Sequence, residues 1–363
     1  MKRKVLLVGL FLIGLSDALR LQPPSAKKLG KQLATLCITT SFCTSIQPLV
    51  PLPAAAVTLE MEKASPMGEE AIKPSDKDIL NVQRAFLDFD SKKFDAADRE
   101  FTTGIQRWKE LKRPRDEIVS LLKARGSVRL DNKKFESAIE DYNEALDLMK
   151  VDGELPDGTA RYPEYPDTIV ERGLAQEGLA DWNGALKDYD KAITLWGGGR
   201  GEGINPFVLT FRGNTLSTLG RYKEAITDYE AAANLFNAAQ DVPRYSDARA
   251  NQALALYQTG SRNEAVKYMK DVIRKNPGYG DMHVALAADS WSQGDYITAL
   301  KEWNFVCDSI SVGCDAYKDM NWVENIRRWP KSLVEKQRQF LNREIPEKLK
   351  GDKSGQLAPP SRT

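Results

Sequence analysis

The sequence predicts an all-helical solenoid of about six helix hairpins closed by a C-terminal capping helix. Two observations carry this prediction. A small residue is followed twelve positions later by Ala, and four positions after that by a large side chain, six times in register. No segment alternates polar and apolar residues over a useful length, so we expect no β-sheet.

The six copies share one internal spacing. Its physical reason is packing, because the small residues let the two helices approach closely and the large side chain fills the space beside them. Every insertion therefore lies between hairpins, the longest at Val151–Pro166 and Gly197–Gly203. The triplets are Ala85, Ala97 and Phe101; Gly126, Ala138 and Tyr142; Gly173, Ala185 and Tyr189; Gly213, Ala225 and Tyr229; Ala253, Ala265 and Met269; and Ala287, Ala299 and Trp303.

Glycines mark the turn inside the later copies. Gly220, Gly260 and Gly294 fall between the two helices, where a left-handed residue ends the first helix. Pro277 closes the fifth copy.

This pattern resembles the tetratricopeptide repeat, whose positions 8, 20 and 24 the triplets occupy. The resemblance covers about Lys77–Ser309 and implies a right-handed superhelix that binds protein or peptide partners in a concave groove lined by the first helices. Tyr257 and Trp291 occupy equivalent groove positions on neighbouring copies and should together grip one peptide segment; the alternative is that Trp291 packs against the C-terminal cap and Tyr257 lies half-exposed without a partner. The implied groove residues are Phe86, Phe89, Leu130, Leu174, Glu177, Asn214, Asn251, Tyr257 and Trp291.

The resemblance also tests one known binding mode. Family members that bind the acidic C-terminal peptides of chaperones use a clamp of Lys and Asn. Asn214 and Asn251 match its asparagines, but Thr210 and Asp281 stand at its basic positions. Without those positive charges, we do not expect this clamp here.

Position 7 is Arg in the first four copies, and position 23 is acidic in the same four. The fifth copy loses both together, with Gln252 and Tyr268. We interpret this joint change as a structural ion pair across each hairpin; the alternative is that the arginines bind a partner. The four pairs are Arg84/Glu100, Arg125/Asp141, Arg172/Asp188 and Arg212/Asp228.

Few residues of the sequence are candidates for catalysis or metal binding. His283 is the single histidine and is interpreted as structural, and no Cys-x₂-Cys pair suggests a metal site. The sequence therefore predicts no enzyme, no metal and no cofactor. Cys307 and Cys314 either form a disulfide or remain two thiols.

The chain continues beyond the sixth copy. Asp319–Arg343 is predicted as helix, either a cap for the array or a docking patch built on Trp322 and Trp329. Pro330 should lie near the start of its last helix.

The N-terminus has the features of a targeting sequence. Residues 1–56 hold seven bases and one acid, and removing these from totals of 52 and 51 leaves 45 bases and 50 acids. A mildly acidic body gives no reason to expect nucleic-acid binding. Four features follow one another along this segment: a basic start, the apolar run Val5–Leu15, a basic stretch without acids, and Ala54-Ala55-Ala56 after a second apolar run. This order resembles the presequence of thylakoid-lumen proteins in algae with complex plastids.

The predicted organisation is a signal peptide (1–18), a plastid transit and thylakoid-transfer segment (19–56), a linker (57–76), the repeat array (77–310), capping helices (311–345) and a disordered tail (346–363). The expected function is a non-enzymatic scaffold in the thylakoid lumen. It would assist assembly or maintenance of a photosynthetic membrane complex by binding one of the subunits of that complex. Peripheral association with the membrane is compatible with this role. The alternative is an endomembrane or secreted adaptor unrelated to photosynthesis.

Overall fold

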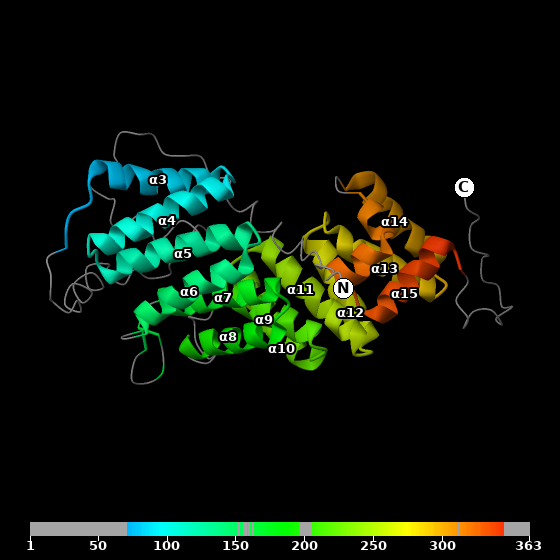
Figure 1. Ribbon diagram of the computed structural model, residues 1–363. Coiled ribbons are helices and arrows are strands. Elements are labelled where there is room, and N and C mark those ends of the chain that lie inside the picture. The colour runs from blue at the N-terminus through cyan, green and yellow to red at the C-terminus, as the bar shows by residue number, and fades with distance from the viewer. Residues whose placement is uncertain are drawn as a thin grey trace, which may run out of the picture. The chain divides into compact units, whose positions relative to one another are not determined.

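The computed structural model describes residues 71–150, 153–154, 158, 160–161, 163–196, 205–310 and 313–344. The predicted segments 1–18, 19–56 and 346–363, and residues 57–70 of the linker, lie outside these residues. The described helices divide into an N-terminal unit, α3 to α8, and a C-terminal unit, α9 to α15. Figure 1 colours the first from blue to green and the second from green to red.

The N-terminal unit consists of three helix hairpins in which each helix packs against the next. The only β-bridge among its described residues joins Glu154 and Ala160 in the inserted loop. Its helices are α3 (Asp76–Asp90), α4 (Phe94–Glu110), α5 (Arg115–Asp131), α6 (Phe135–Met149), α7 (Glu164–Gly178) and α8 (Trp182–Leu195).

The C-terminal unit repeats the hairpin three more times and adds a terminal segment that ends in a helix. Its hairpins are α9 (Pro206–Thr218) with α10 (Tyr222–Ala238), α11 (Val242–Gln258) with α12 (Arg262–Lys275), and α13 (Gly280–Ser292) with α14 (Tyr296–Ser309). The terminal segment contains a 3-10 turn (Asp315–Lys318), a π-helical turn (Trp322–Ile326) and α15 (Lys331–Asn342), for which Pro330 is the N-cap. The predicted array of six hairpins with a capping helix is confirmed.

The core of each hairpin lies where the repeated triplet places it. All six position-20 alanines are fully buried. In the second, third and fourth hairpins, the tyrosine ring lies so close to the glycine that an added Cβ would meet its Cε1 at 2.6–2.7 Å. Glycine at position 8 therefore accompanies tyrosine at position 24, while alanine accompanies the other large residues.

The turn inside each hairpin uses a left-handed residue at the same repeat position. Gly220, Gly260 and Gly294 have φ values of 78°, 86° and 86°, which confirms the prediction for these three. The three hairpins of the N-terminal unit use non-glycine residues there, namely Lys92, Lys133 and Ala180, with φ values of 58–60°. A side chain in this conformation is strained, so the turns of the two units differ in their cost.

Candidate functional site

The structure brings together the arginine and the acid of all four predicted pairs. Nη2 lies 2.6 Å from the carboxylate in Arg125–Asp141, 2.7 Å in Arg172–Asp188 and 2.6 Å in Arg212–Asp228. Nε makes a second hydrogen bond to each of these carboxylates. Arg84 and Glu100 are 3.7 Å apart and more exposed.

The guanidinium groups of Arg125, Arg172 and Arg212 bridge the two helices of their hairpins, as the structural interpretation predicts. The carboxylates of Asp141, Asp188 and Asp228 belong to buried residues, so each bidentate pair joins the two helices of one hairpin away from solvent. Arg172 also donates to Asn143 of the preceding hairpin, at 2.7 Å. Hydrogen bonding to Asp188 raises the pKa of Arg172 and keeps its charge.

In the fifth and sixth hairpins, a different residue performs the bridging. Arg249, three positions before Gln252, donates to that side chain at 2.6 Å and lies over the ring of Tyr268. In the sixth hairpin, His283 at the same position places Nδ1 2.6 Å from Glu302 Oε2, and its Nε2 lies 3.0 Å from the carbonyl oxygen of Pro277. Sequence reasoning missed this shift to position 4, although the chain has a cationic or imidazole residue there in both hairpins.

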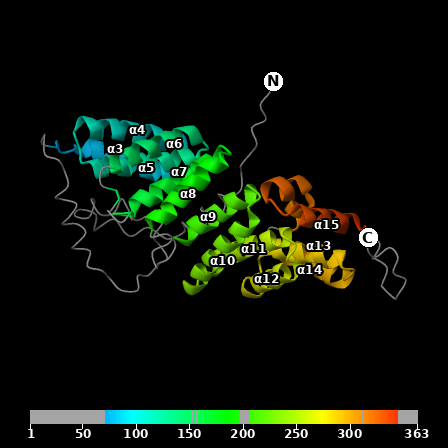
Figure 2. The same cartoon turned by 90° about the horizontal axis from the view of Figure 1, so that it is seen from below.

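The inner face means here the side chains of the first helices at the positions that the resemblance assigns to the groove. In the C-terminal unit, α15 packs along α13 and also contacts α11 (Figure 2). Trp291 is completely buried, stacks edge-on against Phe340 and donates from Nε1 to the Glu344 carbonyl at 2.8 Å. Tyr257 is only 5% exposed and donates to Asp289 at 2.6 Å.

The prediction that Tyr257 and Trp291 grip a partner peptide is therefore wrong. Trp291 packs against the C-terminal cap, as the alternative predicted, but Tyr257 is buried rather than half-exposed. Their large apolar surfaces are buried against the chain's own last helix, with Lys336 lying over the Tyr257 ring at 4.7 Å from its centroid. The segment was expected to cap the end of the array, and it does so by lying on the inner face.

The predicted asparagines are engaged within the same unit. Asn214 Oδ1 accepts from Tyr229 at 2.8 Å and from Asn251 at 3.1 Å, and Asn251 Oδ1 accepts from Arg327 at 3.2 Å. The predicted groove role of Asn214 and Asn251 gives way to these internal hydrogen bonds.

The alternative of a tryptophan docking patch also fails. Trp329 is 3% exposed and donates from Nε1 to Asp281 at 3.0 Å, while Trp322 packs edge-on against Tyr317. Both indoles therefore help to hold the terminal segment in place.

The inner face of the N-terminal unit is different. Phe86 and Phe89 are partly exposed, and each makes one aromatic contact, with Phe101 and Phe94 respectively. Leu130 lies half-buried at the edge of a small cluster that includes Tyr142. Among the described residues, no helix packs over this face as α15 packs over α13.

Two carboxylates on this face are held away from water. Asp167 and Glu171 lie one turn apart on α7 and are both partly buried. Burial raises the pKa of Asp167 to about 6, opposed by Lys123 and reinforced by Glu164. Burial likewise raises the pKa of Glu171 to about 6, opposed by Lys123 and reinforced by Asp167. Sequence reasoning did not single out this pair.

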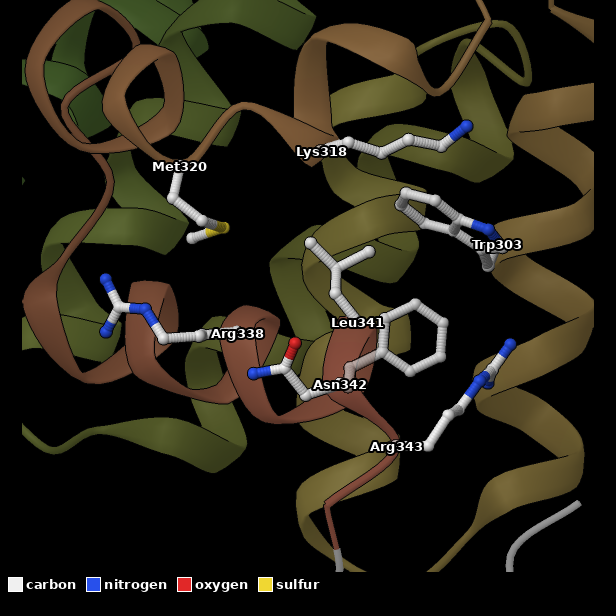
Figure 3. A pocket seen from close by; sticks show the side chains of 8 residues that line it. Trp303, Lys318, Met320, Arg338, Leu341, Asn342 and Arg343 are labelled. Carbon is white, nitrogen blue, oxygen red and sulfur yellow. The ribbon is translucent and has the colours of Figure 1, made fainter. Parts of the chain in front are cut away.

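The two cysteines of the C-terminal unit form a disulfide that links the end of α14 to the segment leading to α15. A separate cavity of about 430 Å³ lies between α14, α15 and the segment that leads to α15 (Figure 3). Its lining offers no carboxylate, thiol or imidazole for acid–base or nucleophilic chemistry; it consists of Trp303, Lys318, Met320, Arg338, Phe340, Leu341, Asn342 and Arg343.

Within the described ranges, no three potential ligands among His, Cys, Asp and Glu gather closely enough to hold a metal ion. None of the helices in that part of the chain is long and apolar enough to cross a bilayer.

Comparison with known proteins agrees with the repeat register. The tetratricopeptide-repeat family model matches residues 208–238, the hairpin of α9 and α10. This hairpin is a tetratricopeptide repeat, and the other five hairpins repeat its register. The Hsp70-Hsp90 organizing protein of Triticum aestivum is 26% identical over 179 residues, which are 49% of this chain and 27% of that relative.

Solved tetratricopeptide-repeat and related structures show the same fold. The apo form of RapI superposes with a TM-score of 0.56 at 12% identity, covering 80% of this chain and 81% of that one. A signal-transduction ATPase with a tetratricopeptide-repeat sensor from Pyrococcus horikoshii gives a TM-score of 0.50 at 17% identity, covering 69% of this chain and 39% of that one. These similarities concern the arrangement of the helices.

Proposed function

We propose that this protein is a non-enzymatic scaffold that holds a protein partner on the inner face of its N-terminal unit. The observation that carries the proposal is the contrast between the two inner faces. The C-terminal one is filled by α15, a helix of the same chain, whereas Phe86, Phe89 and Leu130 remain at the surface of the other. A face of this kind suits a helix that lays apolar side chains into it.

The partner is not proposed to be a chaperone tail. The name of the wheat relative connects that protein with Hsp70 and Hsp90. In this chain, Asp281 stands where the clamp would need a base, and its carboxylate already binds Arg327 at 2.6 Å. A negatively charged peptide end would be repelled there.

The proposed location is the thylakoid lumen, and the proposed role is assembly or maintenance of a photosynthetic membrane complex. The support is the order of basic and apolar segments in residues 1–56. A fusion of these residues to a fluorescent protein should enter the plastid. Fluorescence confined to the secretory pathway would favour the endomembrane or secreted adaptor instead.

The binding face is tested by photo-crosslinking in extracts of the cells that make the protein. A photoreactive phenylalanine analogue replaces Leu130 on the inner face, and the control replaces Glu140, which is exposed on α6. Mass spectrometry should identify a protein adduct for Leu130 that is absent for Glu140. Adducts from Glu140 alone would place the binding surface on the second helices and contradict the proposal.

A further inference from the structure

One repeat position carries aspartate in three hairpins, and the structure shows what two of these residues do. The position lies six residues before the small residue of the triplet and holds Asp167, Asp247 and Asp281. Asp281 is 6% exposed and binds Arg327, and Asp247 accepts from the Tyr279 hydroxyl at 2.8 Å. In both cases the carboxylate receives a donor from another segment of the C-terminal unit.

Asp281 shows how this fold receives a helix. Arg327 donates to its Oδ2 through both Nε and Nη2, at 3.1 and 2.6 Å, just before α15 begins. From there, α15 buries Leu333, Val334 and Phe340 against the unit's core. The arrangement combines an arginine fixed on the aspartate with an apolar helix face laid beside it.

Asp167 occupies the same repeat position on α7 without such a donor. Neither Asp167 nor Glu171 lies within 4.0 Å of a basic group on the described residues, although the charge of Lys123 acts on both. Glu171 Oε2 is shielded from solvent and accepts no hydrogen bond there. A partly buried carboxylate without a hydrogen-bond donor is costly, so a donor supplied from outside would be favoured.

The contrast with the neighbouring residue on the same helix is direct. Arg172 donates its hydrogen bonds to Asp188 inside the hairpin and to Asn143, and none of these bonds goes to Asp167 or Glu171. The carboxylate of Asp188 therefore has an arginine partner inside the hairpin. The carboxylates of Asp167 and Glu171 have only the more distant charge of Lys123.

We propose that Asp167 and Glu171 anchor an arginine of an amphipathic helix belonging to the partner protein, as Asp281 anchors Arg327. Leu130 and Leu174, both half-buried, would contact the apolar side of that helix. A guanidinium suits the site because it makes two parallel hydrogen bonds to a carboxylate. This inference rests on the proposed function and names the chemistry of its partner.

The test uses two labelled synthetic helices with the same leucine spacing, one with arginine and one with glutamate at its polar positions. Fluorescence anisotropy with the full chain should show binding of the arginine helix only. The double variant Asp167→Asn/Glu171→Gln should bind it at least about tenfold more weakly. The control variant Glu136→Gln/Glu140→Gln loses the same two charges from exposed sites on α6 and should change binding less than about twofold.

Three results would overturn the inference: no binding of the arginine helix, no loss in the site variant, or an equal loss in both variants. A photoreactive group on the arginine helix gives a second readout and should form an adduct with α7 in the unaltered chain. When the full chain is crosslinked to itself, adducts between α7 and residues 319–344 of a second copy would identify that copy as the occupant and contradict a separate partner.

The outcome is separable from that of the proposed function. If the crosslinker at Leu130 captures a native partner equally well in the Asp167→Asn/Glu171→Gln variant, the scaffold role stands and the arginine anchor fails. If the arginine helix binds through Asp167 and Glu171 but Leu130 captures no protein from extract, the anchor stands and the proposed role in the cell fails.

Discussion

The two units are built from the same hairpin but treat their inner faces in opposite ways. In the C-terminal unit, Trp291 and Tyr257 are buried under α15, and Asp281 is paired with Arg327. In the N-terminal unit, Phe89 stays partly exposed and Asp167 has no comparable pair. The chain thus covers one inner face with its own helix α15, and we propose that the other inner face holds a partner.

The largest expected effect concerns the filled face. Trp291→Ala should destabilise the C-terminal unit by about 3–5 kcal/mol, because a fully buried aromatic side chain and its hydrogen bond to Glu344 are lost. Phe89→Ala on the other face should cost less than about 1 kcal/mol, since the ring is partly exposed. Chemical denaturation followed by tryptophan fluorescence and circular dichroism measures both, and equal costs would erase the distinction between the two faces.

The next effect concerns the arginine pairs. Arg172→Ala should cost about 2–3 kcal/mol because it leaves Asp188 buried and unpaired, whereas Arg84→Ala should cost less than about 0.5 kcal/mol because its pair is exposed. The full double-mutant cycle with Asp188→Ala should show a coupling above about 1 kcal/mol in thermal denaturation. Additive losses would remove the pairing as a source of stability.

The carboxylates of the open face should give a smaller effect of opposite sign. The folded-state pKa of Asp167 and Glu171 is raised to about 6, above the values of an unfolded chain, so protonation favours the folded state. Their contribution is fully present below about pH 4 and is lost as the pH rises through about 6. Asp167→Asn/Glu171→Gln should therefore stabilise the N-terminal unit by about 1–2 kcal/mol at pH 7.

The measurement for this prediction is thermal unfolding of the variant and the unaltered chain at pH 7 and pH 5. The gain should shrink at pH 5, where the native carboxylates are largely protonated. A gain that is the same at both pH values would show that the two groups do not titrate in this range.

The smallest expected effect concerns the turns. Ala180→Gly should stabilise the third hairpin by about 0.5–1 kcal/mol by relieving a left-handed alanine, and Gly260→Ala should destabilise the fifth by about 1 kcal/mol. Both changes are read from denaturant midpoints. Changes of the same sign would show that this position has different roles in the two units.

The fold followed from the sequence because the triplet spacing is local and repeated. Gly173, Ala185 and Tyr189 sit close in sequence, and their sizes alone specify how the two helices approach. The pairing of Arg172 with Asp188 could be inferred for the same reason, since the fifth hairpin loses both residues together.

The state of the inner faces did not follow, because it depends on where a distant helix packs. Nothing within α11 or α13 shows that α15 covers Tyr257 and Trp291, and these contacts span up to about eighty residues along the chain. The recurrence of aspartate at the position of Asp167 and Asp281 was visible in the sequence. Its meaning became clear only when Arg327 was found on one of them.

The central claim is that the inner face is filled in one unit and open in the other. It is tested most directly by placing an azidophenylalanine in turn at Phe89 and at Tyr257 and irradiating the protein in cell extract. We expect adducts with another protein from Phe89 and an internal adduct with α15 from Tyr257. A foreign protein captured from Tyr257, with none captured from Phe89, would contradict it.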